Sequence, residues 1–171
     1  ICPFLGTSKK TSTAMGMGAA VFFVLVLATL VTYLLNSYVL KPLNLEFLQT
    51  IAFILVIASL VQMVEIILKK ISPSLYTALG VFLPLITTNC CVLGVSLKVV
   101  GDGFIYGNNV GEAVIYAAGI ALGFAVALII FSGLREHIEL METPEGMKGT
   151  PIALITAGIL AMAFMGFAGL V

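Results

Sequence analysis

Cys90-Cys91-Val92-Leu93-Gly94-Val95-Ser96-Leu97-Lys98 is the stretch that decides how this chain is built, because a related stretch occurs 88 residues earlier. The earlier stretch is Cys2-Pro3-Phe4-Leu5-Gly6-Thr7-Ser8-Lys9-Lys10, and the two share the pattern C-x-x-L-G-x-S-x-K. Five of the nine positions are identical. Self-similarity at a fixed offset is the sequence signature of internal repetition. The chain is therefore predicted to contain two copies of one structural unit.

The composition places both copies in a membrane. Hydrophobic residues make up 61% of the 171 residues and charged residues only 9%, far from the usual balance of a soluble domain. The formal net charge is zero, which provides no basic surface for nucleic acid. The chain is therefore predicted to be an all-α integral membrane protein that contacts the lipid bilayer and binds no nucleic acid.

Five charge-free stretches are long enough to cross a bilayer, which takes roughly 20 apolar residues of helix. They are residues 11–40, 47–64, 71–97, 113–134 and 149–171. Residues 1–8 are interpreted as the end of a further span that begins upstream, because the sequence starts at Ile1 in an apolar stretch. We therefore expect a single membrane domain of six transmembrane helices, the first truncated, as two three-helix repeats at about 1–70 and 71–171. An odd number of helices per unit inverts the second repeat, as in many membrane proteins with inverted repeats.

The loops differ in charge. Loops one, three and five carry six cations, which are Lys9, Lys10, Lys69, Lys70, Arg135 and Lys148. Lys41 and Lys98 mark the loops on the other side. Cytoplasmic loops carry an excess of Lys and Arg. This rule predicts that loops one, three and five are cytoplasmic and that both termini lie outside.

Cys2 and Cys90 occupy equivalent positions of the two repeats. Pro84 and the polar residues 87–89 predict a helix break just before Cys90, although a proline-kinked span whose hydroxyls bond to the backbone or to neighbouring helices is the alternative. Thiolates suit iron–sulfur clusters, zinc or copper, and a full cluster site normally needs four of them. The other two are then expected from a second, similar chain. Cys91 is interpreted as an apolar filler, and packing roles for all the cysteines are the structural alternative.

Two carboxylates near the predicted membrane boundary are further candidates. Glu65 precedes Lys69 by four residues and can pair with it along a helix, and Glu112 can cap the fifth span. Either carboxylate can instead belong to an ion path. No catalytic residue is predicted, because the sequence lacks a phosphate loop, a haem-attachment motif and a recognisable Ser–His–Asp set.

Three stretches together resemble the RnfA family of membrane subunits from Rnf complexes, over essentially the whole chain. They are Ile1-Cys2-Pro3-Phe4-Leu5-Gly6, the segment from Pro84 to Cys90 with Leu93-Gly94, and Gly133-Leu134-Arg135-Glu136. The sister family is the E subunit of the sodium-translocating NADH:quinone reductase, and Cys-Pro-Phe-Leu-Gly favours the Rnf branch. The resemblance implies a subunit of a redox-driven, ion-translocating oxidoreductase in a bacterial or archaeal cytoplasmic membrane. In that complex electrons pass from ferredoxin to NAD with export of Na⁺ or H⁺.

The resemblance also implies a shared redox centre. A homologous RnfE-type subunit in the opposite orientation would hold one [2Fe-2S] cluster together with this chain, whose ligands would be Cys2 and Cys90. Cys91 stands where the family usually has a small residue. Flavins and further iron–sulfur centres are expected on other Rnf subunits, and this chain lacks a Ser/Thr-Gly-Ala-Thr flavin-attachment sequence.

A secondary ion or solute transporter is the competing hypothesis, because inverted repeats with broken, polar helices are also typical of transporters. The symmetric cysteines favour the redox subunit, since a transporter does not need two thiolates at equivalent positions.

Overall fold

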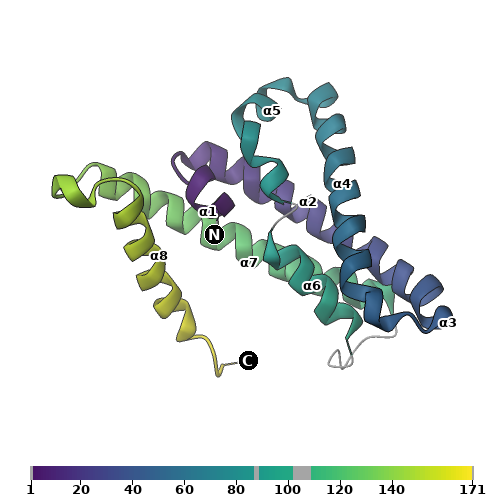
Figure 1. The fold of residues 1–171 in the computed structure, drawn as a ribbon. Helices are drawn as coiled ribbons and strands as arrows, with labels where there is room; N and C mark the ends of the chain where they lie inside the picture. The colour runs from purple at the N-terminus through teal and green to yellow at the C-terminus, as the bar shows by residue number, and fades with distance from the viewer. Residues whose placement is uncertain (1, 87–88, 102–108, 171) are drawn as a thin grey trace.

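The computed structural model describes residues 2–86, 89–101 and 109–170, and every regular element in those ranges is helical (Figure 1). The α-helices, in chain order, are α1 (Cys2–Thr7), α2 (Thr11–Leu35), α3 (Lys41–Leu43), α4 (Gln49–Ile71), α5 (Pro73–Leu79), α6 (Cys90–Val100), α7 (Val110–Glu139) and α8 (Thr150–Met165). A π-helical turn, η1 (Asn36–Leu40), joins α2 to α3, and the 3-10 turns are η2 (Glu46–Leu48), η3 (Gly80–Phe82), η4 (Pro84–Ile86) and η5 (Glu145–Met147). The predicted all-α class is confirmed.

In the described part of the chain, three continuous helical stretches are long and apolar enough to cross a membrane. They are Thr11–Leu43, Gln49–Ile71 and Val110–Glu139, and they match the first, second and fourth predicted spans. Helices are the natural form of such spans because lipid offers no hydrogen-bond partners, whereas a helix satisfies its backbone N–H and C=O groups internally. The helices continue past the charge-free residues because backbone hydrogen bonding does not stop where charged side chains begin.

The third predicted span is divided. Helix α5 ends before Gly80, whose φ of +45° is a conformation that glycine adopts at low cost, and Pro84 opens the next turn. The pieces Pro73–Phe82 and Pro84–Val100 are bent by 55° and form a fourth span if they are counted together. The break expected close to Pro84 is confirmed, and it begins earlier, at Gly80.

The last predicted span is shorter than expected. We predicted residues 149–171, but α8 has 16 residues and ends at Met165, below the roughly 20 that cross the hydrocarbon layer. Gly166 follows the last helical residue, and hydrogen-bonded turns continue from there to Leu170, with a φ of +119° at Gly169.

Helices α2 and α7 pack along each other at the centre of the molecule (Figure 1). Small residues line this contact, and a Cβ atom on Gly18 would lie 3.2 Å from the Cβ of Ala125. Small residues let membrane helices approach closely. Helices α4 and α6 pack on α2, whereas α8 contacts α7 and leans away from the other helices (Figure 1). The α2–α7 pair therefore forms the frame on which both cysteine helices lie.

Candidate functional site

The second cysteine motif begins α6. Cys90 is the first residue of the helix and is exposed, whereas Cys91 is partly buried and packs against the hydrophobic core. Asn89 caps the helix, because its Oδ1 accepts a hydrogen bond of 3.1 Å from the Cys91 N–H. The Asn89 Nδ2 is buried and has no hydrogen-bond partner among the described residues. Helix α6 thus starts with an exposed cysteine beside an unsatisfied amide donor.

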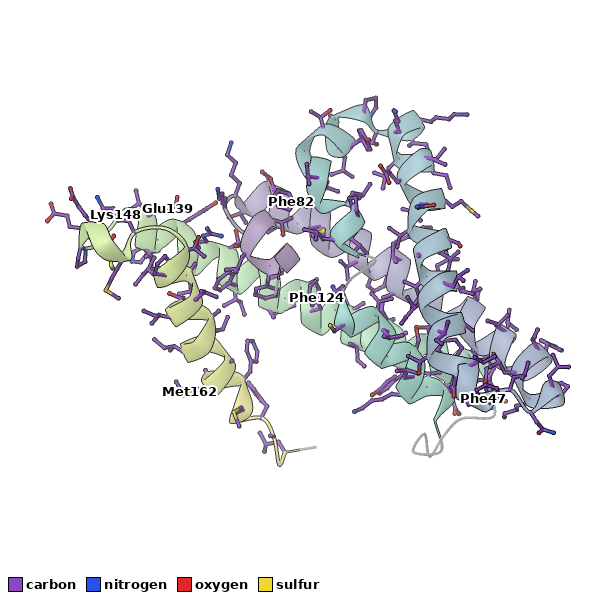
Figure 2. All side chains as sticks on the ribbon, in the orientation of Figure 1. Phe47, Phe82, Phe124, Glu139, Lys148 and Met162 are labelled. Carbon is purple, nitrogen blue, oxygen red and sulfur yellow. The ribbon has the colours of Figure 1, made fainter. Side chains whose placement is uncertain are left out.

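The first cysteine motif forms α1, which begins at Cys2; the Cys2 side chain lies outside the described residues. Helix α1 contacts η3 and η4, the broken segment that leads toward Cys90. A Cβ atom on Gly6 would overlap the Phe82 ring of η3, so glycine permits this close approach. On the other side, the Phe4 ring lies 5.7 Å from that of Phe124 in an edge-on arrangement. Phe82 and Phe124 are labelled close to α1 in Figure 2.

The last turns of α7 form hydrogen bonds with the end of α1. Arg135 is only 9% exposed, and its Nη1 donates to the Leu5 carbonyl and, at 2.8 Å, to the Ser8 Oγ. The Ser132 hydroxyl donates to the Ser8 carbonyl at 3.0 Å. These bonds satisfy carbonyl groups that a helix end leaves without a partner inside the helix.

This role of Arg135 was not predicted from the sequence. We assigned Arg135 to cytoplasmic loop five as a charge marker, but α7 continues to Glu139 and the Arg135 side chain is buried against α1. The available signal was a cation directly after an apolar span whose last three residues include Ser132 and Gly133. His137, two residues further along, is exposed.

The two predicted ion-path carboxylates lie at helix ends. Glu65 is partly buried and accepts a hydrogen bond of 3.5 Å from the Tyr76 hydroxyl. In the described chain Glu65 forms no ion pair with Lys69, whose Nζ instead lies 5.8 Å from the centre of the Tyr76 ring. Glu112 is in the first turn of α7, as a capping role requires. Its Oε2 is buried and lacks a hydrogen-bond partner within the described ranges.

Among the described side chains, which do not include that of Cys2, no group of three or more His, Cys, Asp or Glu residues could hold a metal ion. The ligands predicted from Cys2 and from a second chain lie outside these side chains. The predicted residues Thr87 and Thr88 lie outside the described residues.

Comparison with known proteins identifies the family. The family model described as "Rnf-Nqr subunit, membrane protein" matches residues 1–171. The chain is 56% identical over 171 residues to the A-type subunit of the ion-translocating oxidoreductase complex of Syntrophotalea carbinolica, covering 100% of this chain and 86% of the relative. It is 55% identical over 170 residues to the A-type subunit of the Na(+)-translocating ferredoxin:NAD(+) oxidoreductase complex of Acetobacterium woodii, covering 99% and 86%. The corresponding subunit of Vibrio cholerae El Tor Inaba is 52% identical, with 100% and 86% covered. The chain therefore belongs to the Rnf-Nqr family of membrane protein subunits.

Proposed function

We propose that this chain is the A-type membrane subunit of an ion-translocating ferredoxin:NAD⁺ oxidoreductase complex. The observation that carries the proposal is the end-to-end similarity, at more than half of all positions, to A-type subunits of ion-translocating oxidoreductase complexes, one of which is named as a ferredoxin:NAD(+) oxidoreductase. The three relatives described above are all named as A-type subunits of ion-translocating oxidoreductase complexes, which favours the Rnf branch over the quinone reductase. The same names favour a redox subunit over the secondary transporter. The chain is thus part of a redox enzyme. We further propose that it lies in the cytoplasmic membrane of a bacterium or archaeon with both termini outside, because loops one, three and five carry most of the cations.

Within this complex, Cys2 and Cys90 hold one half of a [2Fe-2S] cluster, and a homologous E-type subunit supplies the other two thiolates. Three features of this chain fit such a group. Cys90 is the first residue of α6, where the positive end of the helix dipole favours a thiolate. Cys90 is exposed, so a second chain can reach it. The unsatisfied Asn89 Nδ2 is a donor of the kind that stabilises cluster sulfurs.

The bound cluster would supply one-electron transfer. The residues of this chain hold it, keep water away and set its environment. Cys91 packs against the core instead, which fits its role as an apolar filler and leaves Cys90 as the ligand. The chain carries no flavin, and other subunits of the complex supply the flavins and further iron–sulfur centres.

The repeats are part of the proposal, and the burial pattern supports them. Helix α7 begins 99 residues after α2, and at this offset five of the seven buried residues of α7 coincide with buried residues between Thr11 and Leu40. The pairs are Ala14 and Ala113, Gly18 and Ala117, Thr29 and Leu128, Thr32 and Phe131, and Asn36 and Arg135. The cysteine motifs are 88 residues apart, and the extra 11 residues correspond to residues 99–109 before α7. Units at about 1–70 and 71–171 thus present the same face to each other.

Glu65 and Glu112 belong to the ion path of the complex. Glu112 supports this assignment because its buried Oε2 has no hydrogen-bond partner in the described part of the chain, and a cation or proton would satisfy it. Glu65 is partly buried beside Tyr76. The transported ion is Na⁺ or H⁺, and the Acetobacterium woodii relative is named for Na⁺.

The experiment is to purify the complex with Cys2→Ser, Cys90→Ser and, as the matched control, Cys91→Ser. Iron content and low-temperature EPR of the membrane cluster are measured for each. We expect both ligand variants to lose the cluster signal and the control to keep it. Retention of the full signal in both ligand variants would falsify the assignment, and loss in Cys91→Ser alone would transfer the ligand role to Cys91.

A further inference from the structure

Helix α1 is described from Cys2 to Thr7 and ends at the junction with α2. One of its flanks is not covered by a packed helix, because Phe4 and Leu5 line an apolar cleft of about 480 Å³ between α1, α7 and α8. The contacts that other elements make with the C-terminal end of α1 therefore help to fix its position, and with it the backbone at Cys2.

The strongest of these contacts come from Arg135. Its guanidinium is buried at the end of α1 and bonds the Leu5 carbonyl and the Ser8 hydroxyl. A cation is favourable there because the C-terminal end of a helix carries partial negative charge. Hydrogen bonds to charged groups are also stronger than bonds between neutral groups. Ser132, one turn earlier on α7, adds its bond to the Ser8 carbonyl.

Glu136 performs the complementary task on the next helix. Its Oε1 accepts hydrogen bonds from the Thr11 N–H at 2.9 Å and from the Thr11 Oγ1 at 2.8 Å. Thr11 is the first residue of α2, and the N-cap residue Lys10 contributes no side-chain capping bond. The carboxylate therefore caps the positive end of α2, while the guanidinium caps the negative end of α1. Ser132, Arg135 and Glu136 are at positions i, i+3 and i+4 and so share one face of α7. A single turn of α7 therefore fixes the junction between α1 and α2.

The second cysteine helix is secured differently. Helix α6 has 11 residues, and Asn89 caps it from within its own segment. It also packs Val92, Val95 and Val99 into the core. The N-terminal end of α6, where Cys90 lies, is therefore capped from its own segment, whereas the C-terminal end of α1 is held by side chains of α7.

We infer that Arg135 is a positioning residue for Cys2, which fixes the first thiol by holding the C-terminal end of α1. The consequence at the cluster rests on the function proposed above, but the effect on the Cys2 thiol does not. A fixed spacing between two ligand thiols matters because a cluster tolerates little variation in ligand geometry.

The test compares Arg135→Gln and Arg135→Lys in the purified complex, with Lys148→Gln as the matched control. Lys148 is an exposed cation beyond the same end of α7. After the iron is removed by a chelator, alkylation of Cys2 and Cys90 by a maleimide is followed by mass spectrometry, and Cys90 serves as the internal reference. We expect Arg135→Gln to raise the ratio of the Cys2 rate to the Cys90 rate about tenfold, the value for loss of one charged hydrogen bond. Arg135→Lys should give a smaller increase, and Lys148→Gln none.

Iron content and EPR of untreated samples form the second part of the test. If the proposed function holds, Arg135→Gln should lower the cluster occupancy or broaden its signal, and Arg135→Lys should partly restore it. Absence of iron in the wild type would reject the proposed function, and the alkylation ratio would still decide the positioning role. An unchanged ratio in Arg135→Gln would overturn the inference, even with iron present. If the Arg135→Gln complex fails to assemble, the ratio of the Cys2 to the Cys90 alkylation rate is measured in Arg135→Lys and Ser132→Ala instead. Unchanged ratios in both variants would overturn the inference.

Discussion

The crossing of α2 and α7 leaves no room for a side chain at Gly18. A Cβ atom there would lie 3.2 Å from the Ala125 Cβ and 3.6 Å from its Cα. The optimal separation of two carbon atoms is about 3.5–4.0 Å, so Gly18→Ala requires α2 and α7 to separate by about 0.3–0.8 Å. Because the Ala125 Cβ is fixed to the backbone, no side-chain rotation can relieve this contact.

The expected cost follows from two opposing effects. Overpacking of a tight contact costs about 1–3 kcal/mol, whereas Ala is favoured over Gly in a helix by about 1 kcal/mol. Gly18→Ala should therefore lose about 0–2 kcal/mol, and Gly18→Leu should lose more because three further carbon atoms must be accommodated. The measurement is the temperature at which half of this protein has left the purified complex, followed by size-exclusion chromatography and immunoblotting.

Gly16→Ala is the matched control, two residues away on the same helix. Its added Cβ would meet only the Cδ1 of Leu75, at 2.9 Å, which is the end of a flexible side chain that can rotate. This variant should be neutral or slightly stabilising. Ala125→Gly should rescue Gly18→Ala, with a coupling energy of about 0.5–3 kcal/mol for two residues in contact. A Gly18→Leu complex as stable as the wild type, or failure of the rescue, would refute the close approach of α2 and α7.

Two further substitutions test the surroundings of the cysteine helices. Asn89→Ala removes the cap of α6 and should destabilise the protein by about 1 kcal/mol. It should also shift the midpoint potential of the proposed cluster, measured in an EPR-monitored titration. An unchanged potential would exclude the Asn89 amide as a donor to the cluster. Phe131→Ala removes a fully buried ring whose centre lies 5.1 Å from that of the Phe4 ring, and it should cost about 3–5 kcal/mol of stability. The protein should therefore leave the purified complex at a lower temperature, and Phe164→Ala on the exposed helix α8 is the control. Equal effects of the two substitutions would contradict the packing of α1 on α7.

The membrane helices were predictable because lipid reduces the problem to apolar length. The stretches at 11–40, 47–64 and 113–134 needed no tertiary information, since nothing but a helix satisfies their backbone in hydrocarbon. Their ends were less predictable. Charged residues such as Arg135 and Glu136 mark the end of the apolar stretch, but they are good helix formers, and α7 continues through them to Glu139.

The site was predictable where its determinants are local. Cys90 follows a proline and a capping asparagine in the sequence, so the start of a helix there could be expected from neighbouring residues. The hydrogen bond that fixes the end of α1 was not predictable, because it joins Leu5 and Arg135, which are 130 positions apart in the sequence. Sequence patterns assign a cation beside an apolar span to the loop that follows it, and only the packing of α7 against α1 shows that this cation is buried.

Two buried polar atoms indicate where the chain gains partners on assembly. The Asn89 Nδ2 and the Glu112 Oε2 have no hydrogen-bond partner in the described ranges, and each such atom costs about 1–3 kcal/mol. Asn89 adjoins the exposed Cys90, so its partner is expected at the surface where we propose that the E-type subunit binds. Glu112 lies in the first turn of α7, the helix whose other end holds the Cys2 helix through Arg135. The same helix therefore joins a candidate ion site to a candidate cluster ligand, and through it a change at one end can reach the other.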